Sequence, residues 1–325
     1  MKKFQKRNII FACLNLEEAM SLSRRTFLGQ SCAATAMATT PGSVWSQTIL
    51  KLGDAKLITL SDGNLVLPGS MVVPDGNMAA ATEILDRYDV GPDQFRPECN
   101  VTLLQTGDRN VIFDVGAGPN FMPSAGRLGD ALAQIDLDPA DVTDVLFTHA
   151  HPDHLWGLTD DFDDLVFANA NYYIGQAEWD YWTDPTTISS INEFRVPFAV
   201  GAASRLSLLS DRINLIQDGQ EPLIGVTALL TPGHTPGHMS FAMHAGKDSR
   251  LIVGDCIANH HLAFEKPAWH SGSDQDAETG ARTRVRLMDR LAVEQIPIIG
   301  FHLPNGGAGR VERRGDGYEF VSEDS

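Results

Sequence analysis

The sequence is short of basic residues. Its 325 residues include 25 Lys and Arg against 42 Asp and Glu, so the formal net charge at pH 7 is −17. Nucleic acids and anionic lipids are bound by clustered basic side chains that neutralise phosphates, and an acidic surface opposes both contacts. The composition therefore argues against nucleic acid as a partner and leaves a small molecule as the expected ligand.

A run of about 20 apolar residues, long enough to cross a bilayer, is also missing. The nearest approach, Ser31 to Thr40, is only weakly hydrophobic and is interrupted by polar residues. It follows the heptapeptide SRRTFLG at residues 23–29, whose Arg24 and Arg25 resemble the paired arginines of a twin-arginine export signal. We therefore expect no membrane span, a signal segment over residues 1–46 that is removed, and a periplasmic or secreted protein. The sequence leaves open whether translation begins at Met1 or at Met20.

Cysteine is scarce as well, with four in the whole chain. Cys13 and Cys32 lie in the expected signal segment, so only Cys99 and Cys256 would remain in the mature protein. A disulfide formed in an oxidising periplasm and two buried free thiols both fit this pattern. No linker or low-complexity run divides residues 47–325, which predicts one α/β domain with a substantial core.

The densest group of chemically active side chains is the heptapeptide THAHPDH at residues 148–154. It follows the apolar run Val145 to Phe147, which predicts a buried strand that ends at a sheet edge. Alternate side chains of an extended backbone point the same way, so His149 and His151 share one side. The aspartate and last histidine of the motif then reach a second position nearby. Because imidazoles and carboxylates are ligands that Zn²⁺ accepts, the motif predicts two adjacent metal ions.

Three further residues of ligand type each follow an apolar, strand-like run. His234 lies after Val226 to Leu230, Asp255 after Leu251 to Val253, and His302 after Ile296 to Phe301. Four separate strands are thus expected to deliver polar side chains at their carboxyl ends.

This order of motifs resembles the metallo-β-lactamase superfamily. HxHxDH comes first, the octapeptide TPGHTPGH at residues 231–238 follows, Gly254-Asp255 comes next, and His302 is last. The resemblance extends from about Leu52 to Val321 and implies a four-layer αββα sandwich. The flanking segments LSDG at 60–63, FDVGAG at 113–118 and GRVE at 309–312 look most like the methyl parathion hydrolase group, which is itself similar to certain N-acyl homoserine lactonases.

The resemblance also implies how the ligands are shared. One metal would be held by three imidazoles, the second by one carboxylate and two imidazoles, and a further carboxylate would bridge them: His149, His151 and His234; Asp153, His154 and His302; and Asp255. The expected cofactors are two Zn²⁺ ions, although other divalent transition metals fit the same ligands. The implied function is an exported dinuclear-zinc hydrolase that uses a metal-bridging hydroxide to cleave a small-molecule ester or lactone, or an organophosphate triester. Asp153 and Asp255 would be its catalytic carboxylates, and a homodimer is compatible with this picture.

Two alternatives stay open on the ligand pattern. Iron-dependent redox enzymes such as persulfide dioxygenases, and thioesterases of the glyoxalase type, share much of the ligand set. A β-lactamase activity is less favoured, since the commonest subclass of true β-lactamases has Cys where this chain has Asp255, and Cys256 is expected to point to the opposite side.

The substrate pocket is expected to be aromatic. In the resembled group, aromatic side chains line the substrate site at places comparable to Phe121, Trp182 and Phe198, although aromatics at such spacing also belong to cores. Residues 69–98, which include a short helix from Ala79 to Tyr88, predict either a lid or binding loop or a surface decoration. By the same resemblance, Asp114 would accept hydrogen bonds behind the metal ligands.

Other features carry structural predictions only. Residues 62–64 (DGN) are expected to form a turn, and His238 to stabilise a loop by hydrogen bonding. His260, His261 and His270 are expected at the surface or rim. Residues 277–295 predict a helix with four arginines on its solvated face: Arg282, Arg284, Arg286 and Arg290.

Overall fold

The computed structural model describes residues 47–73 and 76–323. The expected signal segment, with Arg24, Arg25 and the two alternative start residues, lies outside the described residues. No helix in the described part of the chain combines the length and apolar character needed to cross a membrane.

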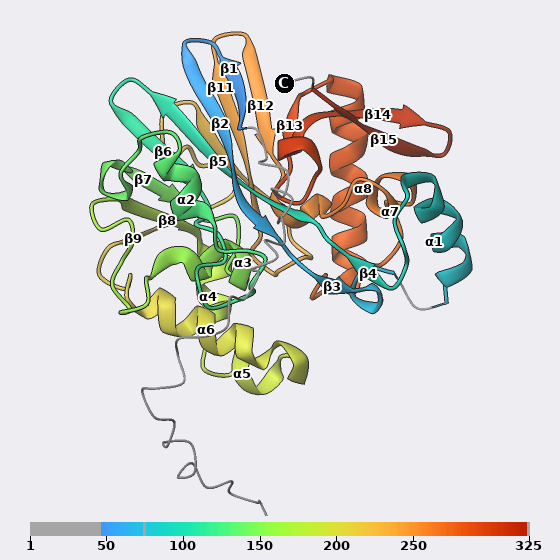
Figure 1. The fold of residues 1–325 in the computed structure, drawn as a ribbon, viewed down its shortest axis with the longest axis horizontal. Helices are drawn as coiled ribbons and strands as arrows, with labels where there is room; N and C mark the ends of the chain where they lie inside the picture. The colour runs from blue at the N-terminus through green and yellow to red at the C-terminus, as the bar shows by residue number, and fades with distance from the viewer. Residues whose placement is uncertain (1–46, 74–75, 324–325) are drawn as a thin grey trace, which may run out of the picture. The chain divides into compact units, whose positions relative to one another are not determined.

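The first sheet has the strand order β1-β2-β5-β6-β7-β8-β9 (Figure 1). Neighbouring strands run antiparallel from β1 to β6 and parallel from β6 to β9. The carboxyl ends of β6 and β7 therefore lie at one edge, where Asp114 and the 148–154 motif follow. The strands are β1 (Thr48–Leu52), β2 (Ala55–Asn64), β5 (Glu98–Thr106), β6 (Arg109–Phe113), β7 (Asp144–Leu146), β8 (Asn171–Gly175) and β9 (Ile213–Ile216).

The second sheet has the order β10-β11-β12-β13-β14-β15. Its one parallel pairing joins β12 and β13, so that Asp255 and His302 follow strands that end on the same side. The strands are β10 (Val226–Leu230), β11 (Met239–Ala245), β12 (Asp248–Ile252), β13 (Ile298–Ile299), β14 (Ala308–Arg314) and β15 (Gly317–Ser322).

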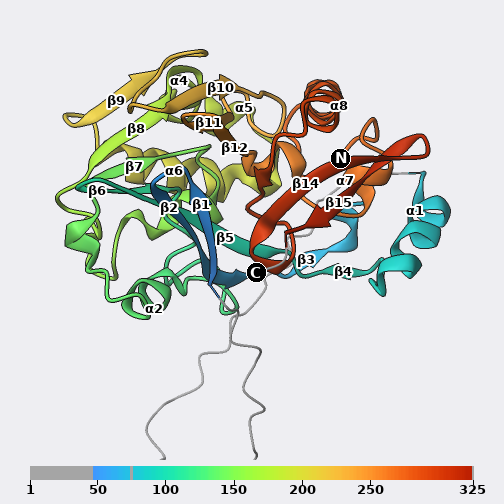
Figure 2. The same cartoon turned by 90° about the horizontal axis from the view of Figure 1, so that it is seen from above.

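The two sheets pack face to face between layers of helices. Alternation along a strand sends Phe113 toward the second sheet, where its ring lies 5.4 Å from that of Phe241, and Ile112 toward the helices. Figure 2 shows α7 and α8 beside β14 and β15. The helices over the first sheet are α2 (Leu128–Ala133), α3 (Pro152–Leu155), α4 (Gln176–Thr183), α5 (Thr187–Ser190) and α6 (Val196–Ser207); those over the second are α7 (Leu262–Glu265) and α8 (Ala277–Glu294). The predicted αββα order is confirmed.

The excursion at residues 69–98 has a small core of its own. Its helix α1 (Met78–Leu85) continues as a 3₁₀ turn to Tyr88, as predicted, and buries Ile84 and Leu85 against Phe95. Two short strands, β3 (Leu67–Pro68) and β4 (Gln94–Phe95), pair at its base. Leu262 of α7 belongs to the same cluster, and its contacts attach the excursion to the domain.

The turn predicted at residues 62–64 is wrong. β2 continues through Asn64 with an irregularity in its register after Ser61. The reason is Asp62, whose buried carboxylate accepts hydrogen bonds from the backbone N–H groups of Ala117, Gly126 and Leu128. Burial raises the pKa of Asp62 to about 6, and these backbone bonds oppose the rise. Asp62 therefore anchors the loop that follows β6.

Cys99 and Cys256 are both buried and free. They lie in different layers, Cys99 in the core between the first sheet and its helices and Cys256 in the core beneath α8. Of the two alternatives left by the sequence, the structure therefore selects free thiols.

Candidate metal centre

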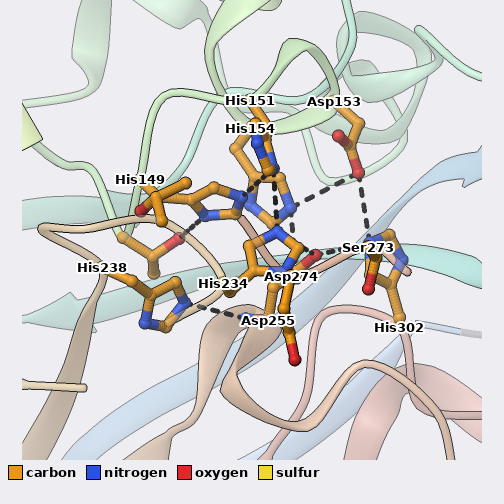
Figure 3. A network of polar contacts seen from close by, with 12 residues as sticks. His149, His151, Asp153, His154, His234, His238, Asp255, Ser273, Asp274 and His302 are labelled. Atoms are coloured by element: carbon orange, nitrogen blue, oxygen red, sulfur yellow. Dashed lines mark hydrogen bonds and ion pairs between the residues drawn. The ribbon is translucent and has the colours of Figure 1, made fainter. Parts of the chain in front are cut away.

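The ligand-type residues predicted from the sequence come together at one end of the sheets (Figure 3). They arrive on the loops that follow β7, β10, β12 and β13. The loop after β7 leads directly into a helix. His151 precedes α3, and Pro152 occupies the first turn of that helix, where its lack of an N–H costs nothing. The two halves of HxHxDH therefore belong to different elements, which directs their side chains to different places.

Three imidazole nitrogens form the first group. Nδ1 of His151 lies 3.1 Å from Nε2 of His149 and 2.8 Å from Nε2 of His234. All three side chains are buried, and their geometry permits a metal ion among them. Such close nitrogen contacts suit a shared cation.

Carboxylates and imidazoles form the second group. Oδ2 of Asp153 lies 3.4 Å from Nε2 of His154 and 3.2 Å from Nε2 of His302. Asp255 lies between the two groups: its Oδ2 is 3.3 Å from Nε2 of His234 and 3.2 Å from Nε2 of His302, and its Oδ1 is 3.3 Å from Nε2 of His154. The structure thus brings together all seven residues expected as ligands.

Three buried atoms of the second group and of Asp255 have no hydrogen-bond partner among the described residues. They are Oδ2 of Asp153, Nε2 of His154 and Oδ1 of Asp255. An unsatisfied buried polar atom costs about 1–3 kcal/mol, so three of them at one place require a ligand to satisfy them. Carboxylate oxygens and imidazole nitrogens are the donor set of a divalent transition metal, and the residues fit such a cofactor.

The outer nitrogens of the imidazoles are held by oxygen atoms. His154 donates from Nδ1 to Asp114 over 2.8 Å, and His302 donates from Nδ1 to the carbonyl of Glu98 over 2.6 Å. In the neutral imidazole, these bonds place the proton on Nδ1 and leave the Nε2 lone pair facing the site. Asp114 also accepts from the N–H and hydroxyl of Thr148, so the hydrogen bonds predicted for it are present.

The pKa values of the imidazoles divide the site in two. Burial lowers the pKa of His149 and of His151 well below the ordinary value, and neighbouring positive charges act in the same direction. Burial also disfavours the charged forms of His154 and His302, but the nearby carboxylates outweigh it and raise both pKa values well above the ordinary one. His149 and His151 therefore favour the neutral form that binds a cation, whereas a cation bound by His154 and His302 competes with their protons.

Glu178 on α4 ties the two histidine loops together, and sequence reasoning missed it. Its buried carboxylate accepts from the N–H of Ala150 over 2.9 Å and from the N–H of Gly237 over 3.1 Å. It also accepts from the hydroxyl of Thr235 and the indole of Trp182, each over 2.6 Å. Three N–H donors and one hydroxyl surround this side chain; burial raises the pKa of Glu178, and these hydrogen bonds oppose the rise and favour the ionised carboxylate. Nothing in the local sequence distinguishes Glu178 from Asp180, the other acidic residue of the same helix.

Asp274 was also missed, and it explains why Arg284 is not solvated. The Asp274 carboxylate lies 3.4 Å from Nδ1 of His234 and accepts from Nη1 of Arg284 over 3.3 Å. Arg284 is 3% exposed and donates to the carbonyls of Pro267 and Trp269 as well. The prediction that it lies on the solvated face is therefore wrong, because the helix turns this position toward the loop that supports His234.

Two predictions for the remaining histidines have different outcomes. His238 was expected to stabilise a loop, and this is confirmed: its Nδ1 lies 2.8 Å from the Thr231 hydroxyl, and its Nε2 accepts from the N–H of Asp255 over 2.9 Å. His261 was expected at the surface or rim: it lines the wall of the cavity described below, but it is only 5% exposed and accepts from the N–H of Leu262 at the start of α7.

A cavity of about 370 Å³ opens beside the metal-ligand residues. Phe121 and Phe198 line it, as predicted, with ring centroids 6.2 Å apart. Trp182 does not line it: this side chain is 1% exposed, donates to Glu178 and packs its ring beneath His151. Burial of the large indole in the core of the first sheet explains the difference. The remaining walls include apolar residues of the excursion, among them Val72 and Phe95.

Comparison with known proteins gives a consistent result. The model of the family described as the metallo-beta-lactamase superfamily matches residues 96–297. The probable metallo-hydrolase YqjP of Bacillus subtilis is 28% identical over 171 residues, which are 48% of this chain and 52% of that protein. The N-acyl homoserine lactonase AttM of Agrobacterium fabrum is 28% identical over 127 residues, which are 38% of this chain and 44% of that protein. The matches thus span about half the length of these curated relatives.

A solved structure covers more of the chain. AidC, described as a dizinc quorum-quenching lactonase in complex with a product, superposes with a TM-score of 0.81 at 25% identity. The match covers 86% of this chain and 98% of that one.

Proposed function

This chain belongs to the metallo-β-lactamase superfamily, and on that premise we propose that it is a dinuclear-metal hydrolase that cleaves an ester-type bond in a small molecule, preferably a lactone. The observation that carries the proposal is the set of orphaned buried atoms of Asp153, His154 and Asp255 beside an apolar cavity. The likeness to AidC and to AttM supports a lactone, and the dizinc description of AidC supports zinc. An organophosphate triester is the second substrate class to be tested.

The two groups of residues would hold one cation each. His149, His151 and His234 would hold the first, Asp153, His154 and His302 the second, and Asp255 would contact both. When bound, two such cations activate a water molecule near neutral pH and polarise the bond that it attacks.

The chain's own residues supply positioning and proton transfer. Asp255 fixes the separation of the two groups, because its oxygens reach both of them. Asp153 lines the cavity through a carboxylate with an unpartnered oxygen, so it is the residue placed to carry a proton to the leaving group. Phe121 and Phe198 exclude water from one side of the cavity and contact the apolar part of the substrate.

The test joins metal analysis to a substrate panel. Purified protein is expected to contain about two zinc-type ions and to hydrolyse lactones faster than phosphotriesters, aryl esters or β-lactams. His151→Ala should lose both bound metal and hydrolysis, because a three-nitrogen site reduced to two binds a cation far more weakly. His244→Ala is the matched control, since this exposed imidazole lies on β11 away from the site. Full activity and metal content in His151→Ala, or iron with no hydrolysis in the wild type, would contradict the proposal.

Export belongs to the same proposal and rests on the paired arginines alone. Changing Arg24 and Arg25 together to Lys should retain the precursor inside the cell, because the pathway reads the arginine pair. Fractionation of cells that express both forms measures this, and unimpaired export of the double variant would refute a twin-arginine signal.

A further inference from the structure

Arg195 is a buried cation in the wall of the cavity. It ends a 3₁₀ helix, Glu193–Arg195, that leads directly into α6, the helix that carries Phe198. The side chain is 9% exposed and lines the same cavity as His151 and Asp153. The cavity wall therefore contains a positively charged side chain that is not one of the metal-ligand residues.

One nitrogen of the Arg195 guanidinium, Nη2, makes all the hydrogen bonds of this side chain within the described residues. Nη2 donates to the carbonyls of Gly272 and Ser273, each over 2.9 Å, and to that of Asp274 over 3.4 Å. Within residues 47–73 and 76–323, neither Nε nor Nη1 donates a hydrogen bond, and no carboxylate forms an ion pair with Arg195. The Asp274 carboxylate is already engaged by His234 and Arg284.

A buried charge without a counter-ion is costly, and three carbonyl dipoles compensate it only in part. In the described part of the chain no carboxylate forms an ion pair with this guanidinium, and the carboxylate that acts on its charge, Asp274, is shared with His234 and Arg284. Arginine presents its donors as a planar fork that matches the two oxygens of a carboxylate. The free donors of Arg195 are thus matched to an anion that comes from outside the chain.

We propose that Arg195 binds a carboxylate of the substrate, so that the substrate is an ester or lactone that carries a free carboxylate away from the bond to be cleaved. This rests on the proposed hydrolase function for the identity of that bond. The metal groups take the scissile end, and Arg195 holds the anionic end of the same molecule.

If Arg195 had only a structural role, its substitution would have different effects. Its bonds to residues 272–274 also steady the loop that carries Asp274, which supports His234. If that were its whole task, a substitution would weaken metal binding and would affect every ligand of the cavity equally.

The experiment measures binding of two matched acids to the metal-loaded protein by calorimetry. Pentanoate has one carboxylate for the metal centre, whereas glutarate has the same chain length and a second carboxylate; succinate and adipate vary the spacing. Each acid is measured with the wild type, Arg195→Gln and Arg195→Lys, and metal content is determined for each protein. Arg205→Gln is the matched control, because this arginine lies on α6 and packs on Trp156 outside the cavity.

The wild type should bind its best dicarboxylate at least about tenfold more tightly than pentanoate, as expected for a charge-assisted bidentate pair. Arg195→Gln should abolish that preference with unchanged metal content, Arg195→Lys should keep part of it, and Arg205→Gln should keep all of it. Absence of the preference in the wild type, or equal weakening of both acids in Arg195→Gln, overturns the proposal. The preference is measured without turnover, so a protein that shows it but hydrolyses nothing in the panel contradicts the hydrolase function and leaves anion binding by Arg195 standing.

Discussion

Replacing Glu178 by Gln keeps the shape of the side chain and changes what it can accept. One carboxylate oxygen accepts from Ala150 and Trp182, and the other accepts from Thr235 and Gly237. In the amide, one of these oxygens becomes an NH₂ group. If the amide nitrogen faces Thr235, the hydroxyl turns to accept from it, but the N–H of Gly237 is left without an acceptor.

The magnitude follows from that one orphaned donor. A buried N–H without a partner costs about 1–3 kcal/mol. In a domain of this size, each kcal/mol corresponds to roughly 2–4 °C, so the midpoint of thermal unfolding should fall by roughly 2–12 °C. Gly237 and Thr235 flank the loop of His234, and Ala150 lies between His149 and His151. We therefore also expect metal affinity to fall by about tenfold or more, as for other residues that orient ligands from behind.

The assay is thermal unfolding with and without added zinc, together with zinc affinity by competition against a chelator. Asp180→Asn is the control, because it makes the same chemical change on an exposed residue of the same helix. Wild-type unfolding temperature and zinc affinity in Glu178→Gln would refute the reasoning that this carboxylate couples the two histidine loops.

Two further predictions concern the metal groups themselves. Asp255→Ala should fold, since the side chain contributes no core packing, but it should lose kcat because nothing then fixes the separation of the two groups; a near-native rate would exclude a bridging role. Zinc binding should release protons and strengthen as pH rises through neutrality. In the metal-free protein, burial opposes the charge of His154 and His302, but Asp153 and Asp255 outweigh it and raise both pKa values well above the ordinary one, so protons compete with zinc for these imidazoles. Calorimetry in two buffers with different ionisation enthalpies measures the release, and a pH-independent affinity would contradict it.

Local patterns predicted most of the elements. Apolar runs located β7, β10 and β12, and helical spacing located α1 and α8 within a few residues. The turn at residues 62–64 failed because Asp-Gly-Asn is a strong turn signal by itself, whereas the backbone donors that hold Asp62 come from residues more than 50 positions later. Local propensity contains no information about such distant partners.

The sequence by itself determined the family, the αββα architecture and the group of residues that lies at the site. The site residues could be recognised because histidine and aspartate are uncommon in protein cores and each of them follows an apolar strand. His149, His234 and His302 can therefore be identified without any knowledge of distances. Only the tertiary structure decided which atoms face one another, and which ordinary residues support them. Glu178, Asp274 and Arg195 look like common polar residues of helices and loops; they become distinctive through burial and through partners such as Gly237, His234 and Gly272, which come from other segments of the chain. Packing also places Trp182 in the core and not in the cavity wall, and the sequence could not show this because a tryptophan on a helix looks the same whether it faces a ligand or the core.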